Sequence, residues 1–215
     1  MATPIHSKLI NKAAREILKP NGLTRKGQSR IWFDDNGWWI SIVEFQPSSW
    51  SKDTYLNTGI NWQWYPKSDF AFDLCYRESD FVEFECEESF FQQALELAEK
   101  AKMKVVAFRE ALSVPLDAKN FILENTVGDR QNIWTSLNKG MACLHALEYR
   151  QAAKYFTDVI ECSDNRDWAL SVKTFVNNMI TLTPEEQVLF VRNSISESRK
   201  MKKLPQSEVL FGNGA

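Results

Sequence analysis

Residues 56–64 read LNTGINWQW, and this stretch decides the fold class. Its side chains alternate in type from one residue to the next, which is the two-residue period of a β-strand. One face carries Leu56, Thr58, Ile60, Trp62 and Trp64, and the other carries Asn57, Gly59, Asn61 and Gln63. Such alternation is typical of an antiparallel sheet with one buried and one solvated face. We therefore expect the amide face to be open to water.

The same period continues on both sides of this stretch. Two apolar runs in residues 31–46 are joined by Asp34-Asp35-Asn36-Gly37, a composition that suits a tight hairpin. Residues 70–77 and 82–86 also alternate. The sequence thus predicts an antiparallel meander of four or five strands. The run 38–46 is apolar on both faces at its start, so we expect it to be central, with a helix or a loop over its second face.

Helical periodicity is found before and after the segments predicted to form this sheet. An N-terminal helix is expected over residues 5–17, and after residue 88 apolar residues recur at helical spacing to the end of the chain. The expected later helices cover residues 91–108, with a break near Met103, then 116–124, 131–147, 149–161, 166–181 and 184–200. The predicted fold class is therefore α+β. Gly128-Asp129-Arg130 predicts a boundary between an α+β domain, 1–128, and a helical region packed on it, 129–215, with a frayed tail from Phe211.

Composition excludes several classes of protein. The chain has 215 residues, a net charge of -2 and 44% hydrophobic residues, which is typical of a globular protein and not of a dedicated nucleic-acid binder. It contains no apolar run of membrane-spanning length and no Cys-x-x-Cys pair, so we expect a cytoplasmic protein with reduced cysteines. Neither a nucleophile-elbow nor a P-loop string occurs. We expect no cofactor, no metal site and no enzymatic activity.

Only two histidines are present, His6 and His145. Cys143 and His145 lie two residues apart on an expected helix, so their side chains diverge by about 200°. We interpret them as a packed cysteine beside a surface histidine and not as a pair of metal ligands.

Charge is unevenly distributed along the chain. Residues 69–88 contain eight acidic residues and one basic residue, a local sum of -7. Together with the amide face of the meander they suggest a flat acidic surface that binds a protein with a basic surface. The candidate residues are Asn57, Asn61, Gln63, Asp73, Arg77, Glu83 and Glu85. The alternative is that the acidic strands lie near the basic helix, or that both are simply solvated.

Residues 8–30 contain seven basic residues and one acidic residue, a local sum of +6. This block supports a second hypothesis, binding of RNA or a nucleotide through Arg25, Lys26 and Arg30 with a neighbouring exposed aromatic ring. An enzymatic function would require a cleft in which carboxylates converge.

Residues 140–161, GMACLHALEYRQAAKYFTDVIE, resemble a tetratricopeptide unit, with the helix pair near 136–161. The matching positions are Gly140, Ala142, Leu144, Tyr149, Ala152, Tyr155 and Phe156. Cys143 replaces an expected aromatic residue, and Leu147 replaces an expected glycine. The resemblance implies a helical hairpin that either packs on the rest of the protein or presents a groove for a peptide.

The first two-thirds of the chain resembles a bacterial family catalogued as a domain of unknown function, number 4304. The resemblance is carried by the opening helix and by the segments LKPNGLTRKGQSRIWF, WWISIVEFQPSSW and LNTGINWQW. The matching positions are Lys19, Pro20, Gly22, Arg25, Lys26, Gly27, Gln46, Ser48, Asn57 and Gly59, whereas Leu23 departs from the usual phenylalanine. The family implies an α+β architecture and no catalytic residue.

Overall fold

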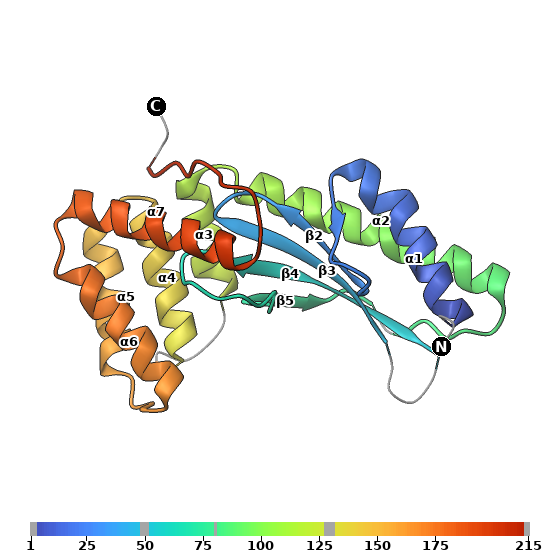
Figure 1. Ribbon diagram of the computed structural model, residues 1–215, viewed down its shortest axis with the longest axis horizontal. Coiled ribbons are helices and arrows are strands. Elements are labelled where there is room, and N and C mark those ends of the chain that lie inside the picture. Colours follow the sequence, from blue (N-terminus) through green and yellow to red (C-terminus); the bar gives the residue numbers. More distant parts are fainter. Residues whose placement is uncertain (1–3, 48–51, 80, 127–131, 213–215) are drawn as a thin grey trace. The chain divides into compact units, whose positions relative to one another are not determined.

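The computed structural model describes residues 4–47, 52–79, 81–126 and 132–212. It is an α+β protein with an N-terminal helix, a five-stranded antiparallel sheet and a helical C-terminal half, as the sequence predicts (Figure 1). The chain divides into two compact units, and each is described by itself. Unit 1 comprises residues 1–61 and 70–110, and unit 2 comprises residues 62–69 and 111–215. The expected boundary at 128–130 lies outside the described residues.

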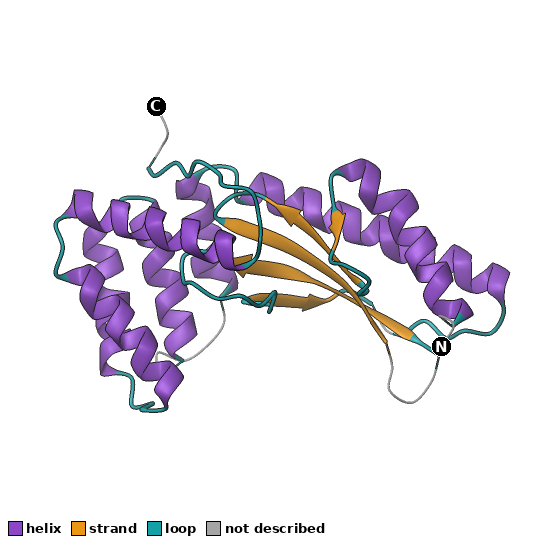
Figure 2. Cartoon of the chain, in the orientation of Figure 1, coloured by secondary structure: helices purple, strands orange, loops and turns teal. Residues whose placement is uncertain are grey.

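Figure 2 shows the strands of the sheet, which follow one another in space as they do in sequence, β1-β2-β3-β4-β5. Their bounds are β1 Thr24–Arg25, β2 Ile31–Asp35, β3 Trp39–Pro47, β4 Thr54–Trp62 and β5 Leu74–Arg77. The hairpin between β2 and β3 is confirmed, with Asp35 paired to Ile40 across the turn. The central position of β3 is also confirmed. Ile40 and Ile42 are fully buried, and Phe70 from the loop before β5 packs on Phe33 with ring centroids 5.2 Å apart.

Two helices cover the other face of the sheet in unit 1. They are α1 Ile5–Leu18 and α2 Glu87–Ala111, and a short 3-10 turn, η1 Lys19–Asn21, follows α1. The core between helices and sheet is built from Ile10, Ala13, Ala14 and Leu18 of α1, Phe90, Ala94, Ala98 and Val105 of α2, and Trp32, Val43, Phe45 and Leu56 of the strands. α2 is continuous through Met103, so the expected break there is wrong.

One ion pair ties α2 to the β2–β3 hairpin. Arg109 donates from Nε and Nη2 to the two carboxylate oxygens of Asp34, at 2.9 and 2.8 Å, and from Nη2 to the Asn21 carbonyl oxygen. Hydrogen bonding to Asp34 raises the pKa of Arg109. The end of the hairpin and the turn after α1 are therefore held to the same side chain.

Two strands differ from the prediction. β5 begins at Leu74 and not at residue 70, and residues 82–86 form no strand beyond a single bridge between Val82 and Thr54. Two-residue β1 was not predicted.

Unit 2 contains the remaining helices, which agree closely with the helical periodicity. They are α3 Pro115–Asn125, α4 Ile133–His145, α5 Tyr149–Glu161, α6 Asp167–Ile180 and α7 Pro184–Met201. Asn132 caps α4, and Thr183 with Glu186 forms a capping box at the start of α7. The C-terminal residues to Gly212 are docked in this unit, because Gly212 donates to the His145 carbonyl oxygen and His145 Nε2 lies 2.7 Å from the Leu210 carbonyl oxygen. The expectation of a tail frayed from Phe211 is wrong for Phe211 and Gly212, and the last three residues lie outside the described part.

The ends of α4 and α7 place ordinary side chains in a left-handed backbone conformation. Leu147 has φ 62° and Lys203 has φ 59°, and each follows its helix at the position where glycine is common. This conformation costs about 1–2 kcal/mol for a residue with a Cβ atom.

We expect Lys203→Gly to raise the free energy of unfolding by about 0.5–1 kcal/mol, after allowance for the extra freedom of glycine in the unfolded chain. Leu147→Gly should raise the free energy of unfolding by less, because it also removes the contact of Leu147 Cδ1 with Gly212. Chemical denaturation of the two variants measures both effects. Destabilisation by Lys203→Gly would contradict a left-handed backbone conformation of Lys203 after α7.

Candidate functional site

The predicted amide face of the meander is not an open platform. Asn57 is 5% exposed, and Asn61 and Gln63 are fully buried, so the expectation of a wet face is wrong for all three amides. Asn61 donates from Nδ2 to the Ala71 carbonyl oxygen at 2.7 Å, and Gln63 Oε1 accepts from Ser198 Oγ at 3.1 Å. Both amides hold the fold together and are not available to a partner.

The structure brings two of the seven predicted residues together on the sheet. Asn57 donates from Nδ2 to Gln46 Oε1 at 2.8 Å and to Glu44 Oε2 at 3.1 Å, and Arg77 donates to Gln46 Oε1 at 3.0 Å. Arg77 also lies over the Tyr55 ring, 4.4 Å from its centroid. We call Glu44, Gln46, Asn57 and Arg77 the polar sheet cluster. Sequence reasoning missed Glu44 and Gln46 in it, although strand alternation places both on the face of Asn57.

The remaining predicted residues lie elsewhere. Asp73 is half-buried, and one of its carboxylate oxygens lies 3.4 Å from Asn61 Nδ2. Glu83 and Glu85 are exposed, but they lie in the segment before α2 and not on a strand. The seven residues therefore do not form one surface.

Residues 81–88, which we call the acidic segment, form an exposed acidic stretch of unit 1. Its four carboxylates, Glu83, Glu85, Glu87 and Glu88, are all exposed. Phe81 at its start is 54% exposed, and its ring meets the Tyr55 ring edge-on with centroids 6.2 Å apart. Because Tyr55 also supports Arg77, the acidic segment begins beside the polar sheet cluster.

The residues of the second hypothesis are also divided. Arg25 and Arg30 line one hollow beside α1, whereas Lys26 lies over Phe70 with its Nζ 4.1 Å from the ring centroid. The hollow has a volume of about 540 Å³ and is named the basic hollow below. Its lining residues are Ser7, Lys8, Asn11, Lys12, Arg15, Arg25, Gln28 and Arg30. No aromatic ring is among the described residues that line it, although Lys12 Nζ lies 4.4 Å from the centroid of the Phe91 ring.

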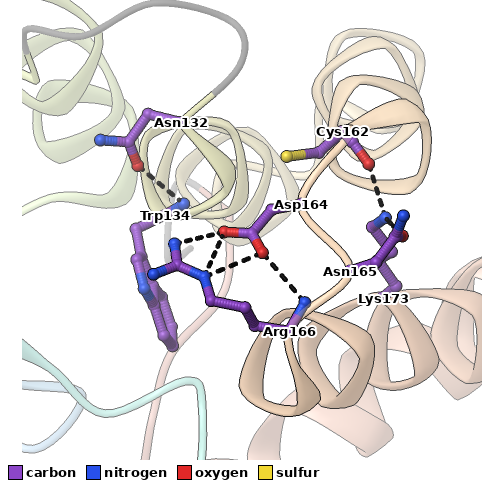
Figure 3. A network of polar contacts seen from close by, with 7 residues as sticks. All are labelled: Asn132, Trp134, Cys162, Asp164, Asn165, Arg166 and Lys173. Atoms are coloured by element: carbon purple, nitrogen blue, oxygen red, sulfur yellow. Dashed lines mark hydrogen bonds and ion pairs between the residues drawn. The ribbon is translucent and has the colours of Figure 1, made fainter.

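Unit 2 contains a dense polar network in the loop between α5 and α6 (Figure 3). Asp164 accepts two hydrogen bonds from Arg166 Nε and one from Nη2, which lowers the pKa of Asp164 to about 2. Lys173 donates to the Cys162 carbonyl oxygen at 2.5 Å and to Asn165 at 3.2 Å. Trp134 stacks on Trp168 with centroids 5.9 Å apart. The hydrogen bonds of Asp164 and Lys173 stabilise the conformation of the loop between α5 and α6.

His145 is buried, so its assignment to the surface is wrong, whereas Cys143 is buried as expected. Burial lowers the pKa of His145 to about 4 and raises the pKa of Cys143 to about 11. A neutral imidazole and a protonated thiol are therefore expected at pH 7.

Within the four described ranges, histidine, cysteine, aspartate and glutamate form no group of three that could hold a metal ion. None of the described helices has an 18-residue stretch apolar enough to cross a membrane.

Comparisons with models of protein families, with curated proteins and with solved structures found no match to this chain. The resemblances to family 4304 and to a tetratricopeptide unit therefore stay predictions.

Proposed function

We propose that this chain is a non-enzymatic binding module that holds a protein with a basic surface through the acidic segment. The observation that carries this proposal is the exposed Phe81 ring beside four exposed carboxylates. The sequence suggests a flat sheet face as the binding surface, and the proposal assigns this role to the acidic segment instead. Of the residues first suggested, Glu83 and Glu85 belong to the acidic segment.

The arrangement has the features of a protein-binding surface. Aromatic residues often dominate the binding energy of an interface when they insert into a pocket of the partner. Phe81 is held from one side by Tyr55, which limits the entropy lost when its ring is immobilised. The exposed carboxylates that follow it in the chain would attract a basic partner and select against acidic ones.

The polar sheet cluster supports the same surface. Gln46 accepts hydrogen bonds from both Asn57 and Arg77, and Arg77 lies over Tyr55. These contacts hold Arg77, which is exposed, beside the ring that supports Phe81. Arg77 is thus a further candidate contact, and Asn57 positions it through Gln46.

A binding module without catalytic groups suits an immunity or accessory factor of the bacterial cytoplasm. Such a factor needs a surface that matches one protein and needs no cofactor. The helix pair α4–α5 is the other candidate surface for a protein.

Charge reversal of the acidic segment tests the proposal. We expect Glu83→Lys/Glu85→Lys to reduce retention of the partner from native lysate at least tenfold, because two attractive charges become repulsive. Phe81→Ser should reduce it by a similar factor, as expected when an interface anchor worth about 2 kcal/mol is removed. Quantitative mass spectrometry of the retained proteins measures both effects.

The matched control is Glu197→Lys/Glu208→Lys, which changes the net charge equally at two exposed positions of unit 2. It should retain the partner as the wild-type chain does. If the wild type retains no protein, or if all variants retain the same proteins in equal amounts, the proposal is wrong.

Binding of RNA or a nucleotide is the second candidate function. It is favoured by the basic hollow, in which Arg25 and Arg30 meet the cationic side chains of α1.

A further inference from the structure

The basic hollow is lined from two elements of unit 1. Lys8, Lys12 and Arg15 come from α1, and Arg25 and Arg30 come from the ends of the turn between β1 and β2. The other described residues that line it are Ser7, Asn11 and Gln28, so the described part of the lining has five cationic side chains and no acidic one. Most of the local charge of residues 8–30 is thus gathered at one place.

Helix geometry explains why the three cations of α1 face the same way. Positions 8, 12 and 15 are separated by four and three residues, which places them on one face of a helix. The opposite face buries Ile10, Ala13 and Leu18 in the core of unit 1. The cationic face is therefore fixed in direction by the packing of α1.

The turn between β1 and β2 is shaped by its own arginines. Arg25 donates from Nε to the Ser29 carbonyl oxygen and from Nη2 to the Gln28 carbonyl oxygen, both at 2.7 Å. Arg30 donates from Nη2 to Ser7 Oγ at 2.5 Å, which fastens the turn to α1. The two walls of the basic hollow are thus connected before any ligand arrives.

The charge of the basic hollow is not compensated within the described residues. None of its five cationic side chains forms an ion pair there. Arg30 is half-buried, its Nη1 is buried without a hydrogen-bond partner, and burial lowers the pKa of Arg30. A partly desolvated guanidinium without a counter-charge is costly, and an anion beside it would offset that cost.

We propose that the basic hollow binds a chain of consecutive phosphate groups, as found in the backbone of single-stranded RNA or in a polyphosphate. From Lys8 to Arg15 the cations extend about 10 Å along α1. A strand in a duplex carries a phosphate about every 3.4 Å along its axis, so at that spacing this row spans about three intervals and matches three or four phosphates. Among the described residues the lining holds cationic and amide side chains and no aromatic ring, which favours phosphates over bases as the groups recognised.

This inference also corrects the residues of the sequence-based hypothesis. Arg25 and Arg30 line the basic hollow, whereas Lys26 is not one of the described residues that line it. Lys8, Lys12 and Arg15 take its place. The inference does not depend on the acidic segment, and its test uses other ligands and other variants.

The test is binding of a fluorescein-labelled U12 oligoribonucleotide and of inorganic tripolyphosphate to the full chain. We expect U12 to bind at 50 mM salt and to dissociate as salt rises. The logarithm of the binding constant should fall with the logarithm of the salt concentration, with a slope of about 0.7 per phosphate neutralised. Lys12→Glu/Arg15→Glu should weaken U12 binding at least tenfold, and both residues are exposed, so their replacement leaves the core intact. Tripolyphosphate that displaces U12 identifies the phosphate chain alone as sufficient, whereas failure to displace it identifies a nucleic-acid backbone.

Two controls make the result decisive. Lys200→Glu reverses an exposed charge on α7 and should leave U12 binding unchanged. Glu83→Lys/Glu85→Lys should not weaken U12 binding, so loss of a protein partner and loss of this site are distinguished. The inference is overturned if neither ligand binds at 50 mM salt, or if Lys200→Glu weakens U12 binding as much as Lys12→Glu/Arg15→Glu.

Discussion

Gly59→Ala is expected to lower the free energy of unfolding by about 3 kcal/mol or more, because the added methyl group has no room. A Cβ atom at this position would lie 2.0 Å from the Leu74 carbonyl oxygen and 2.6 Å from Phe72 Cδ1. Gly59 is paired with Cys75 across β4 and β5, so the backbone of β5 would have to move away. Urea unfolding followed by tryptophan fluorescence measures the loss.

Gly27→Ala is the matched control for the added methyl group. Nothing lies within 4 Å of a Cβ atom at Gly27, but its φ of 56° disfavours alanine. We expect a loss of about 1 kcal/mol there, from backbone strain alone. If Gly59→Ala costs no more than Gly27→Ala, the pairing of β4 with β5 and the position of Phe72 are wrong.

Gly140→Val should destabilise unit 2 by about 2–3 kcal/mol through overpacking between α4 and α5. A Cβ atom at Gly140 would lie 2.5 Å from Phe156 Cε1 and 2.7 Å from its Cδ1. Phe156 is 2% exposed, so its ring cannot move aside without displacing other buried side chains or entering solvent. The same urea titration measures this effect, because Trp134 lies on α4.

A second substitution separates overpacking from other causes. Phe156→Leu removes the ring atoms that a side chain at Gly140 would meet, at a cost of its own from the cavity it leaves. The double variant Gly140→Val/Phe156→Leu should therefore lose less free energy of unfolding than the two single variants lose in sum, by at least about 1 kcal/mol. Additive effects would contradict the close approach of the two helices.

Local patterns in the sequence predict much of this fold. Asp34-Asp35-Asn36-Gly37 identifies the hairpin, and helical periodicity identifies α3 to α7 nearly to the residue. Thr183 predicts the start of α7, where it forms a capping box with Glu186. These features depend on neighbours in sequence, and a single sequence contains that information.

The solvation of the sheet could not be predicted in the same way. Alternation assigns Asn61 and Gln63 to one face, but it does not say what covers that face. Gln63 bonds Ser198, which lies 135 residues later. Val82 to Cys86 alternate as a strand does, yet only Val82 forms a bridge, with Thr54. A distant segment decides the first case, and in the second case alternation does not show whether a neighbouring strand pairs with the segment.

The basic hollow was partly readable from the sequence. The spacing of Lys8, Lys12 and Arg15 gives one helix face. The separation of Lys26 from Arg25 was not readable, because β1 was not predicted and Lys26 follows its last residue. The approach of the turn to α1 depends on the hydrogen bond between Arg30 and Ser7, for which sequence spacing gives no signal. The burial of His145 had no local signal either, since the tail residue Leu210 lies beside it.

Hydrogen exchange of the complex tests the proposed protein-binding surface most directly. The chain would be labelled in deuterated water with and without the purified protein that it retains from lysate. The account predicts slower exchange of the amides in residues 81–88 on binding, with no change in α5, α6 and α7. Slower exchange confined to those helices, with residues 81–88 unchanged, would contradict it.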